Sequence, residues 1–268
     1  LSLTDAQFFG LEIAAWKDSP RRRAQLDGER YYRGDQDILR RKRMAIGAGG
    51  QLKEVHNLPN NKIIDNQYAL RVDQKTNYLL GRPVSFSCEN PDHLKLLRRQ
   101  FGAGFQRTLK YIGEDALNHG IAWLYVYYDE AGRLAFRRFP GYEVLPFWAD
   151  DDHTRLDAAA RLYRQEVWEG LAKKTIQRVE LYKPDGLYRY LLEGSTLIPD
   201  TSLGPYAPYL TVEGSHGPEA YAWQRFPLIP FKYTKQELPL LNRVRSLQDG
   251  INTILSDFEN NTQEVARN

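Results

Sequence analysis

The sequence predicts an α+β fold, with helices first, an antiparallel sheet next and one long helix at the C-terminal end. Three observations lead to this prediction. Apolar residues recur at helical spacing through the first 120 residues, whereas β-branched and aromatic residues gather in short runs between residues 121 and 233. A narrow apolar seam follows, with steps of four and three residues. Helices grouped before strands are typical of the α+β class.

Capping residues and apolar spacing define the helices of the first part. Pro20 suits the first turn of a helix over 20–32, which follows another helix over 4–16. A long helix is expected over 61–80, because apolar residues recur there every four residues on one face. Two further helices, over 90–102 and 105–120, complete the helical part.

Turn residues delimit the strands that follow. Ile121–Tyr128 and Leu134–Phe139 flank Asp-Glu-Ala-Gly at 129–132, and this arrangement predicts a β-hairpin. A Pro-Asp-Gly turn at 184–186 predicts a second hairpin, because proline fixes φ and glycine accepts positive φ. Residues 199–218 include seven prolines or glycines and are expected to form a loop. The other expected strands cover 142–148, 161–168, 175–182, 187–192 and 228–233.

Composition and charge exclude several classes of protein. The 268 residues suffice for one large domain or two small ones with a buried core. A net charge of +3 does not by itself indicate a nucleic-acid-binding protein. Cys88 is the single cysteine, which excludes an internal disulfide and a multi-cysteine metal site. The longest apolar run, Ile121–Tyr128, is far too short to cross a membrane. The sequence also lacks a P-loop and a His-Glu-x-x-His motif.

An acidic turn is the strongest candidate for enzymatic chemistry. Asp150, Asp151, Asp152 and His153 follow the strand expected to end at Trp148. Carboxylates beside an imidazole could hold a divalent metal ion, as a metal-dependent DNA-processing enzyme would require. The other interpretation is a solvated turn between two strands, because aspartate favours turns and no second acidic cluster of similar density accompanies it.

Two basic clusters are candidates for a contact surface. Residues 21–43 contain nine basic and four acidic residues. Such a patch could bind the phosphates of a nucleic acid. It could equally be a solvated helix face, or a surface that meets an acidic neighbour in an assembly. The clusters are Arg21, Arg22, Arg23 and Arg40, Arg41, Lys42, Arg43.

The C-terminal helix is expected over 238–265 and carries the narrow apolar seam. A seam of this width suits contact with one other helix, or with another subunit, better than it suits a wide core face. Packing on its own domain is the alternative. Asp257 and Glu264, seven residues apart, lie within about 20° of each other around a helix and form an acidic stripe. The seam residues are Leu240, Val244, Leu247, Ile251, Ile254 and Phe258.

Six blocks of sequence, taken in order, resemble those of one protein family. They are YYRGDQDIL at 31–39, NNKII at 60–64, NYLLGRPV at 77–84, GYEVLPFWAD at 141–150, FPLIPF at 226–231 and the segment 243–257. Together they run through most of residues 31–258 and resemble the portal, or head-to-tail connector, proteins of long-tailed bacteriophages. In that family the acidic residues near 150 belong to a loop after a strand.

The resemblance implies a wing-like α+β domain over 1–235 and the first stem helix over 236–268. The chain would then stop before the clip, the second stem helix and the crown. The resemblance also implies a ring of identical subunits, usually twelve, at one capsid vertex of the virion, assembled in the host cytoplasm. Double-stranded DNA would pass through this ring without sequence-specific contact. The seam then becomes a stem-helix interface, and Asp257 and Glu264 become channel-facing residues.

The same resemblance implies particular partners. They are further copies of the chain, the terminase large subunit, the head–tail adaptor, and the major capsid and scaffolding proteins, with no membrane. It implies no catalytic residue, cofactor or metal, because nucleotide hydrolysis belongs to the terminase. The alternatives are an enzyme that uses Asp150, Asp152 and His153, and a monomeric nucleic-acid-binding module that uses the basic clusters.

Overall fold

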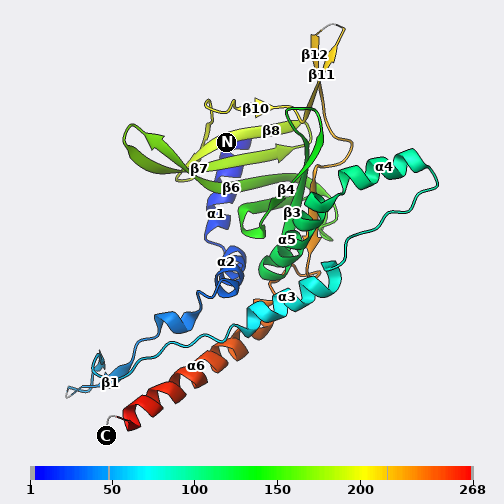
Figure 1. Cartoon of the computed structure of the whole chain (residues 1–268). Coiled ribbons are helices and arrows are strands. Elements are labelled where there is room, and N and C mark those ends of the chain that lie inside the picture. The colour runs from blue at the N-terminus through cyan, green and yellow to red at the C-terminus, as the bar shows by residue number, and fades with distance from the viewer. Residues whose placement is uncertain (1–3, 48, 216, 267–268) are drawn as a thin grey trace.

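The α+β class predicted from the sequence is confirmed by a computed structural model, which describes residues 4–47, 49–215 and 217–266. Figure 1 shows a β-rich body, helices below and beside it, and one long helix that runs away from it. The helices are α1 (Asp5–Lys17), α2 (Pro20–Tyr32), α3 (Gln67–Leu80), α4 (Pro91–Gln100), α5 (Ala103–His119) and α6 (Leu241–Val265), with 3-10 turns η1 (Asp37–Arg40) and η2 (Gly141–Glu143).

Two antiparallel sheets form the body. The larger sheet has the order β10-β8-β7-β6-β5, with β9 also paired to β8, and the smaller sheet has the order β13-β3-β4. Two further hairpins, β1-β2 and β11-β12, stand apart from them. The strands are β1 (Met44–Ile46), β2 (Leu52–Glu54), β3 (Ile121–Tyr128), β4 (Leu134–Phe139), β5 (Val144–Trp148), β6 (Leu156–Glu169), β7 (Ala172–Lys183), β8 (Gly186–Glu193), β9 (Thr196–Pro199), β10 (Tyr206–Ala207), β11 (Leu210–Gly214), β12 (Gly217–Tyr221) and β13 (Leu228–Lys232).

The hairpins predicted from turn residues are confirmed. Strands β3 and β4 pair with Tyr128 opposite Leu134, across the turn at 129–132. Strands β7 and β8 meet with Lys183 opposite Gly186. Both turns are fixed by neighbouring residues, so local sequence is sufficient to place them.

Helix α1 anchors the N-terminal part on the larger sheet. A capping box at Thr4 begins this helix, and its apolar face buries Phe9, Ile13 and Trp16. These large side chains pack against β6, where the small residues Ala158 and Ala160 leave room for them. Small residues facing large ones allow the close packing that a protein core requires.

Helices α2, α3 and α5 form a second layer beneath the smaller sheet (Figure 1). Helix α2 lies so close to α5 that a Cβ atom at Gly28 would be 1.8 Å from the carbonyl oxygen of Asn118. Helix α5 ends at Gly120, which has φ +79°, and a Cβ atom there would be 2.1 Å from the carbonyl oxygen of Glu237. Glycine is therefore required at both positions by the approach of neighbouring backbone.

A buried carboxylate ties the body to the start of α6. Glu237 is 1% exposed and pairs with Arg21, with Lys232 at 2.9 Å and with His153 Nδ1 at 3.0 Å. Burial alone would raise the pKa of this carboxyl, but hydrogen bonds from Lys232 and His153 hold the pKa below its usual value. Glu237 itself adopts a left-handed φ of 57°.

The long C-terminal helix is present but begins later than the sequence indicates. Helix α6 starts at Leu241 rather than near 236–238, because the preceding backbone is held by the body. The Leu240 N–H donates to the carbonyl oxygen of Leu117 at 2.8 Å. The helix then continues through Gly250 without a break. Within the ranges that the structure describes, no helix has the length and apolar character needed to cross a bilayer.

The prediction of a single helix over 61–80 is wrong for residues 61–66. Residues 60–66, which we call the strap, are extended, and α3 begins only at Gln67. Asn66 caps α3 by accepting a hydrogen bond from the Ala69 N–H at 3.1 Å. The backbone N–H groups of the strap donate to side chains of α6 instead of forming helical hydrogen bonds within the strap.

The loop predicted over 199–218 also contains regular structure. Strand β10 adds to the edge of the larger sheet, and β11 and β12 form a projecting hairpin with Leu210 opposite Tyr221. The abundance of proline and glycine marks turns at the ends of these short strands rather than a continuous loop.

Candidate functional site

A hydrogen-bonded ladder joins the strap to α6. Backbone N–H groups of alternate strap residues donate to polar side chains that are four residues apart on the helix. The strap runs antiparallel to α6, so an advance of two residues along the strap corresponds to four residues back along the helix. The three bonds are Asn61 N–H to Asn260 Oδ1 (2.7 Å), Ile63 N–H to Ser256 Oγ (2.9 Å) and Asp65 N–H to Asn252 Oδ1 (3.1 Å).

Asn252 forms the end of the ladder nearest the body and is fully buried. Its side-chain oxygen also accepts from Gln248 Nε2 at 3.0 Å, and its Nδ2 donates to Gln36 Oε1 at 2.5 Å. Gln248 bonds the carbonyl oxygen of Asp65 at 2.7 Å and the N–H of Tyr68 at 2.8 Å. The buried face of α6 is therefore polar and closely paired, as a buried polar face must be.

The sequence contained a signal for this face. Gln248, Asn252, Ser256 and Asn260 recur every four residues, which places them on one side of a helix. From the sequence alone, such a polar stripe would be interpreted as a solvent-exposed helix face, because the segment that covers it is not known. The strap, which pairs with this stripe, lies almost 200 positions earlier in the chain, and no local sequence pattern indicates the pairing.

The apolar seam predicted on this helix divides into two parts. Leu240 is 5% exposed and Val244 packs with it against a buried cluster around Tyr31 and Tyr68, so this end belongs to the chain's own core. Ile251 is partly buried. The remaining seam residues are open to solvent, with exposed fractions of 67% for Leu247, 69% for Ile254 and 71% for Phe258.

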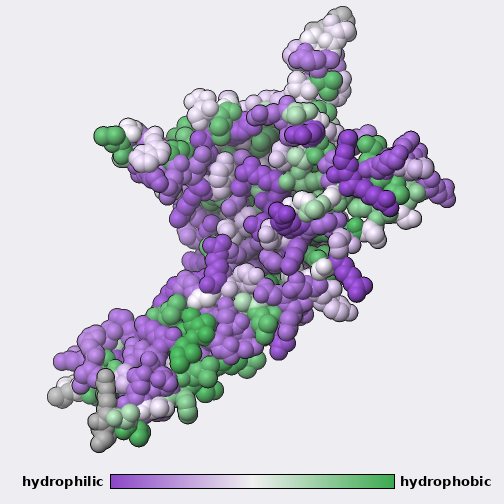
Figure 2. All heavy atoms as spheres, in the orientation of Figure 1, coloured by the Kyte–Doolittle hydropathy of each residue, from purple (hydrophilic) through white to green (hydrophobic). Residues whose placement is uncertain are grey.

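Val265, at 77% exposed, extends the open part of the seam. Together, Leu247, Ile254, Phe258 and Val265 form what we call the apolar stripe. At about 100° per residue, the stripe occupies an arc of about 40°, and its centre is about 180° from the centre of the polar ladder. Figure 2 shows hydrophobic side chains gathered along the edge of the molecule over α6.

The second basic cluster and the acidic stripe of α6 pair with each other. Arg41 bonds Asp257 at 2.6 Å, and Arg43 bonds Glu264 at 2.5 Å. The other two members are also paired within the chain: Arg40 with Asp35 at 2.9 Å and Lys42 with Glu54 at 3.0 Å. Much of the charge expected to face a nucleic acid or a channel is thus offset inside the subunit.

The first basic cluster is dispersed. Arg21 pairs with the buried Glu237, and Arg23 points to solvent. Arg22 is partly buried and stacks on Trp16, with its guanidinium carbon 5.0 Å from the ring centroid. The three arginines therefore have separate surroundings, and they do not form one continuous basic surface.

The structure does not bring the acidic turn together as a metal centre. Asp150 Oδ1 accepts from the N–H groups of Thr154 (2.8 Å) and Arg155 (3.1 Å), so it closes its own turn. Asp152 lies 3.5 Å from Lys235. His153 turns the other way, stacking on Trp148 and bonding Glu237. Asp150 thus stabilises a turn, whereas His153 packs against Trp148 instead of being solvated as the turn interpretation assumed.

A buried cluster that the sequence did not indicate lies between α2 and α5. In the described residues, Glu29, Asp115 and His119 are the one group of three side chains spaced to hold a metal ion. Each already has partners: His119 Nε2 lies 3.0 Å from Glu29 and Asp115 lies 3.2 Å from Arg138. His119 Nδ1 accepts from the Gly141 N–H at 3.3 Å, so the neutral ring carries its proton on Nε2 and donates it to Glu29.

Asp115 should make the stability of the protein depend on pH. Burial raises its pKa to about 6, although the charges of His119 and Arg138 act in the opposite direction. An acid whose folded-state pKa is raised stabilises the fold below its unfolded pKa and loses that contribution as the pH rises through the folded value. Relative to Asp115→Asn, wild-type protein should therefore lose about 2 kcal/mol of unfolding free energy between pH 4 and pH 7. Urea denaturation at four pH values measures this difference, and parallel curves for the two proteins would contradict it.

Comparison with known proteins agrees with the sequence resemblance. The family model described as "Phage portal protein, SPP1 Gp6-like" matches residues 16–268. The portal protein of Bacillus phage SPP1 is 29% identical over 233 residues, which cover 86% of this chain and 45% of that protein. The portal protein of Clostridium phage phiCD119 is 24% identical over 261 residues, which cover 92% of this chain and 54% of that protein. The chain thus spans about half the length of these curated relatives. It belongs to the SPP1 Gp6-like family of phage portal proteins.

Proposed function

We propose that the chain is a subunit of a homo-oligomeric ring at one capsid vertex, through which double-stranded DNA passes during packaging and ejection. Portal proteins are structural components of the phage virion, and membership of their family supports the proposal. The observation in this chain that carries it is the apolar stripe of α6. Four large apolar side chains in line and open to water are unusual for a monomer and indicate an interaction surface.

In this proposal the ring contains about twelve copies and has no catalytic role of its own. It is a docking platform for the terminase large subunit while DNA enters and for the head–tail adaptor afterwards. Around it lie the major capsid and scaffolding proteins. Asp257 and Glu264 would contribute to the channel wall as ion pairs with Arg41 and Arg43, so the wall neither grips DNA strongly nor repels it over a long range.

The hairpin β1-β2 offers a second apolar face for the same assembly. Ile46 pairs with Leu52 across the two strands, and Met44 lies two residues before Ile46, so the three side chains share one face. Their exposed fractions are 45% for Met44, 76% for Ile46 and 67% for Leu52. A two-stranded hairpin has little stability alone, so an open apolar face on one suits burial against a partner.

The ion pairs of Arg41 and Arg43 hold the hairpin beside the C-terminal half of α6, about 90° around the helix from the stripe. Figure 1 shows β1 next to that end of α6. Rotation about a ring axis keeps every residue at its own height, so two different faces at one level can meet between neighbours. We therefore propose that the hairpin of one copy covers Phe258 and Val265 of the next copy.

Charge favours the same contact. Residues 40–53 contain five basic and no acidic residues, whereas residues 246–266 contain four acidic and no basic residues. The intrachain pairs already show that these two segments attract each other. Because these pairs use most of the charges within the subunit, only the remaining ones, such as Lys53 and Glu259, can add to an apolar contact between subunits.

Particle mass tests the ring. Size-exclusion chromatography with light scattering, followed by negative-stain microscopy, should give a closed ring with a central hole for the complete gene product. A monomer at all concentrations would contradict the proposed function.

Cysteine pairing then tests the contact, in a Cys88→Ser background. An Ile46→Cys chain mixed with a Phe258→Cys chain should form a disulfide-linked dimer, while neither chain alone should. Leu171→Cys, at a fully exposed hairpin tip, is the matched control and should not link to Phe258→Cys. Dimers from Phe258→Cys alone would mean that stripes meet each other. Rings without the mixed dimer would refute this contact and leave the ring standing.

A further inference from the structure

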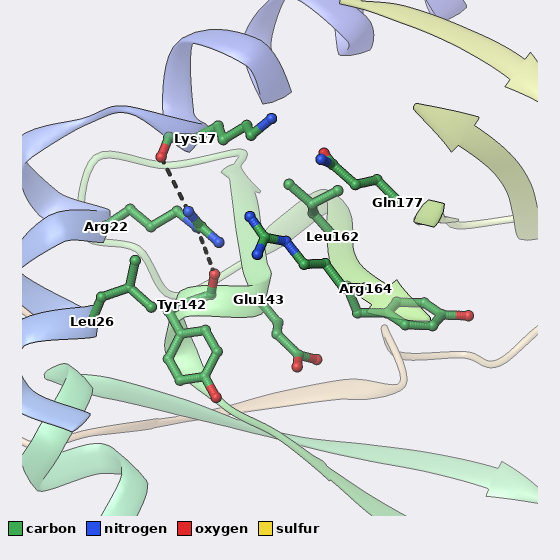
Figure 3. A pocket seen from close by; sticks show the side chains of 9 residues that line it. Lys17, Arg22, Leu26, Tyr142, Glu143, Leu162, Arg164 and Gln177 are labelled. Atoms are coloured by element: carbon green, nitrogen blue, oxygen red, sulfur yellow. Dashed lines mark hydrogen bonds between the residues drawn. The ribbon is translucent and has the colours of Figure 1, made fainter. Parts of the chain in front are cut away.

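A pocket beside the larger sheet brings together cationic side chains that form no salt bridge with an acidic group in the described residues. It has a volume of about 360 Å³ and lies where the turn between α1 and α2 faces β6 and β7. Lys17, Arg22 and Arg164 line it, together with the amide of Gln177 and the buried side chain of Leu162. Figure 3 shows the guanidinium groups of Arg22 and Arg164 facing each other in this pocket.

Arg22 is held rigidly from one side. Its Nε donates to the carbonyl oxygen of Tyr142 at 2.9 Å, and its Nη1 donates to the carbonyl oxygen of Lys17 at 3.1 Å. The guanidinium also stacks on Trp16. These contacts use two of the five N–H groups of an arginine, so the rest remain available on the pocket side.

The other donors have no partner among the described residues. No hydrogen bond or ion pair joins the guanidinium of Arg164, the ammonium of Lys17 or the side-chain amide of Gln177 to any described group. Glu143 is the one carboxylate in the lining, and Arg161 Nε already bonds it at 2.9 Å. Burial and then the charge of Arg164 lower the pKa of Arg22, while the charges of Asp18 and Glu143 act in the opposite direction. Two facing cations therefore repel each other at a site that carries excess donors and positive charge.

We infer that this pocket binds an oxyanion, and that a phosphate group is the ligand its donors fit. Two guanidinium groups can each present parallel N–H donors to the oxygens of one phosphate, which is the geometry in which arginine binds phosphate most strongly. An anion between Arg22 and Arg164 would also remove their mutual repulsion. The volume accommodates the group together with water or with the molecule that carries it. This site is independent of the apolar stripe and of the ring.

Melting temperature in sodium phosphate, compared with sodium chloride at equal ionic strength and pH, tests the inference. Phosphate should raise the melting temperature of wild-type protein above that in chloride. In Arg164→Gln the concentration giving half the shift should rise about tenfold or more, because a charge-assisted bond is lost. Arg164→Lys should lie between the two, since lysine keeps the charge and loses the fork. Arg107→Gln, an exposed arginine on α5, is the charge-matched control and should behave as wild type.

Two further arms identify the source of the ligand. If Arg164→Gln weakens binding of a short DNA duplex as it weakens phosphate, and phosphate competes with the duplex, the phosphate is that of DNA. If duplex binding is unchanged, the ligand is a small phosphate compound. Equal shifts in wild type and Arg164→Gln, or no shift beyond chloride, would overturn the inference. A dependence on Arg164 seen with acetate and absent with phosphate would also overturn it, in favour of a carboxylate from a protein partner.

Discussion

Replacing Asn252 with leucine should lower the free energy of unfolding by about 3 kcal/mol, although the two side chains have similar volumes. The substitution leaves the partly buried N–H of Asp65 and the buried Oε1 of Gln36 without their partners. Each unsatisfied buried group costs roughly 1–3 kcal/mol. Because leucine has a similar volume, the substitution leaves no cavity that would add to this cost. Urea denaturation measures the loss, and hydrogen exchange at Asp65 should become faster in the variant.

Thr253→Ala is the matched control, because Thr253 is the next residue on the same helix and is exposed. It should change the free energy of unfolding by less than about 0.5 kcal/mol. If Asn252→Leu were as stable as wild type, the strap would not depend on the ladder for its position. The interpretation of the polar face as the anchor of α6 would then be wrong.

Ile254→Asp should abolish ring assembly while leaving the subunit folded. Ile254 is 69% exposed, so the fold loses no core contact, and the melting temperature should hardly change. In a ring, the same aspartate would be buried without a partner at every subunit boundary, at a cost of about 3–5 kcal/mol each. Light scattering should show monomers or short open oligomers. Ile251 is a poorer target, because it is partly buried in the subunit itself.

Leu171→Asp controls for the added charge, since Leu171 is fully exposed on the β6-β7 hairpin, far along the chain from α6. Its rings should form normally. Unfolding of Ile254→Asp would assign Ile254 to the core of the subunit. Intact rings from Ile254→Asp would show that the stripe is not an interface.

The elements that sequence analysis placed correctly are those with local causes. Strands β3 and β4 and helix α2 have the predicted bounds, because turn residues, a proline in the first turn and the alternation of side chains act within a few positions. The seam of α6 was predicted from its spacing, but the structure divides it into a covered part and an open part. The cause of this division lies outside the local sequence. Leu240 and Val244 are covered because the body encloses the first turns of the helix, whereas Ile254 lies beyond the body.

The features that sequence analysis missed depend on partners distant in the chain. Ile64 in the strap continues the four-residue spacing of Tyr68 and Val72, which predicted a helix there. The N–H groups of the strap instead bond side chains about 190 residues later. The basic and acidic residues were each identified as surfaces, and pairing of Arg41 with Asp257 became evident only in three dimensions. Glu237 and His119 gave no signal, because one buried polar residue has no pattern.

The ladder between the strap and α6 also sets its own length. Two residues of extended chain advance about 6.6 Å, whereas four residues of helix advance about 6.0 Å. Each rung therefore falls about 0.6 Å further out of step, and after a few rungs a side chain can no longer reach the next N–H group. The strap and α6 can therefore stay in register with each other over only a few rungs. Substitutions between rungs leave this register intact. Inserting a single residue in the strap would instead place carbonyl oxygens opposite the side-chain oxygens of α6 that accept the N–H groups.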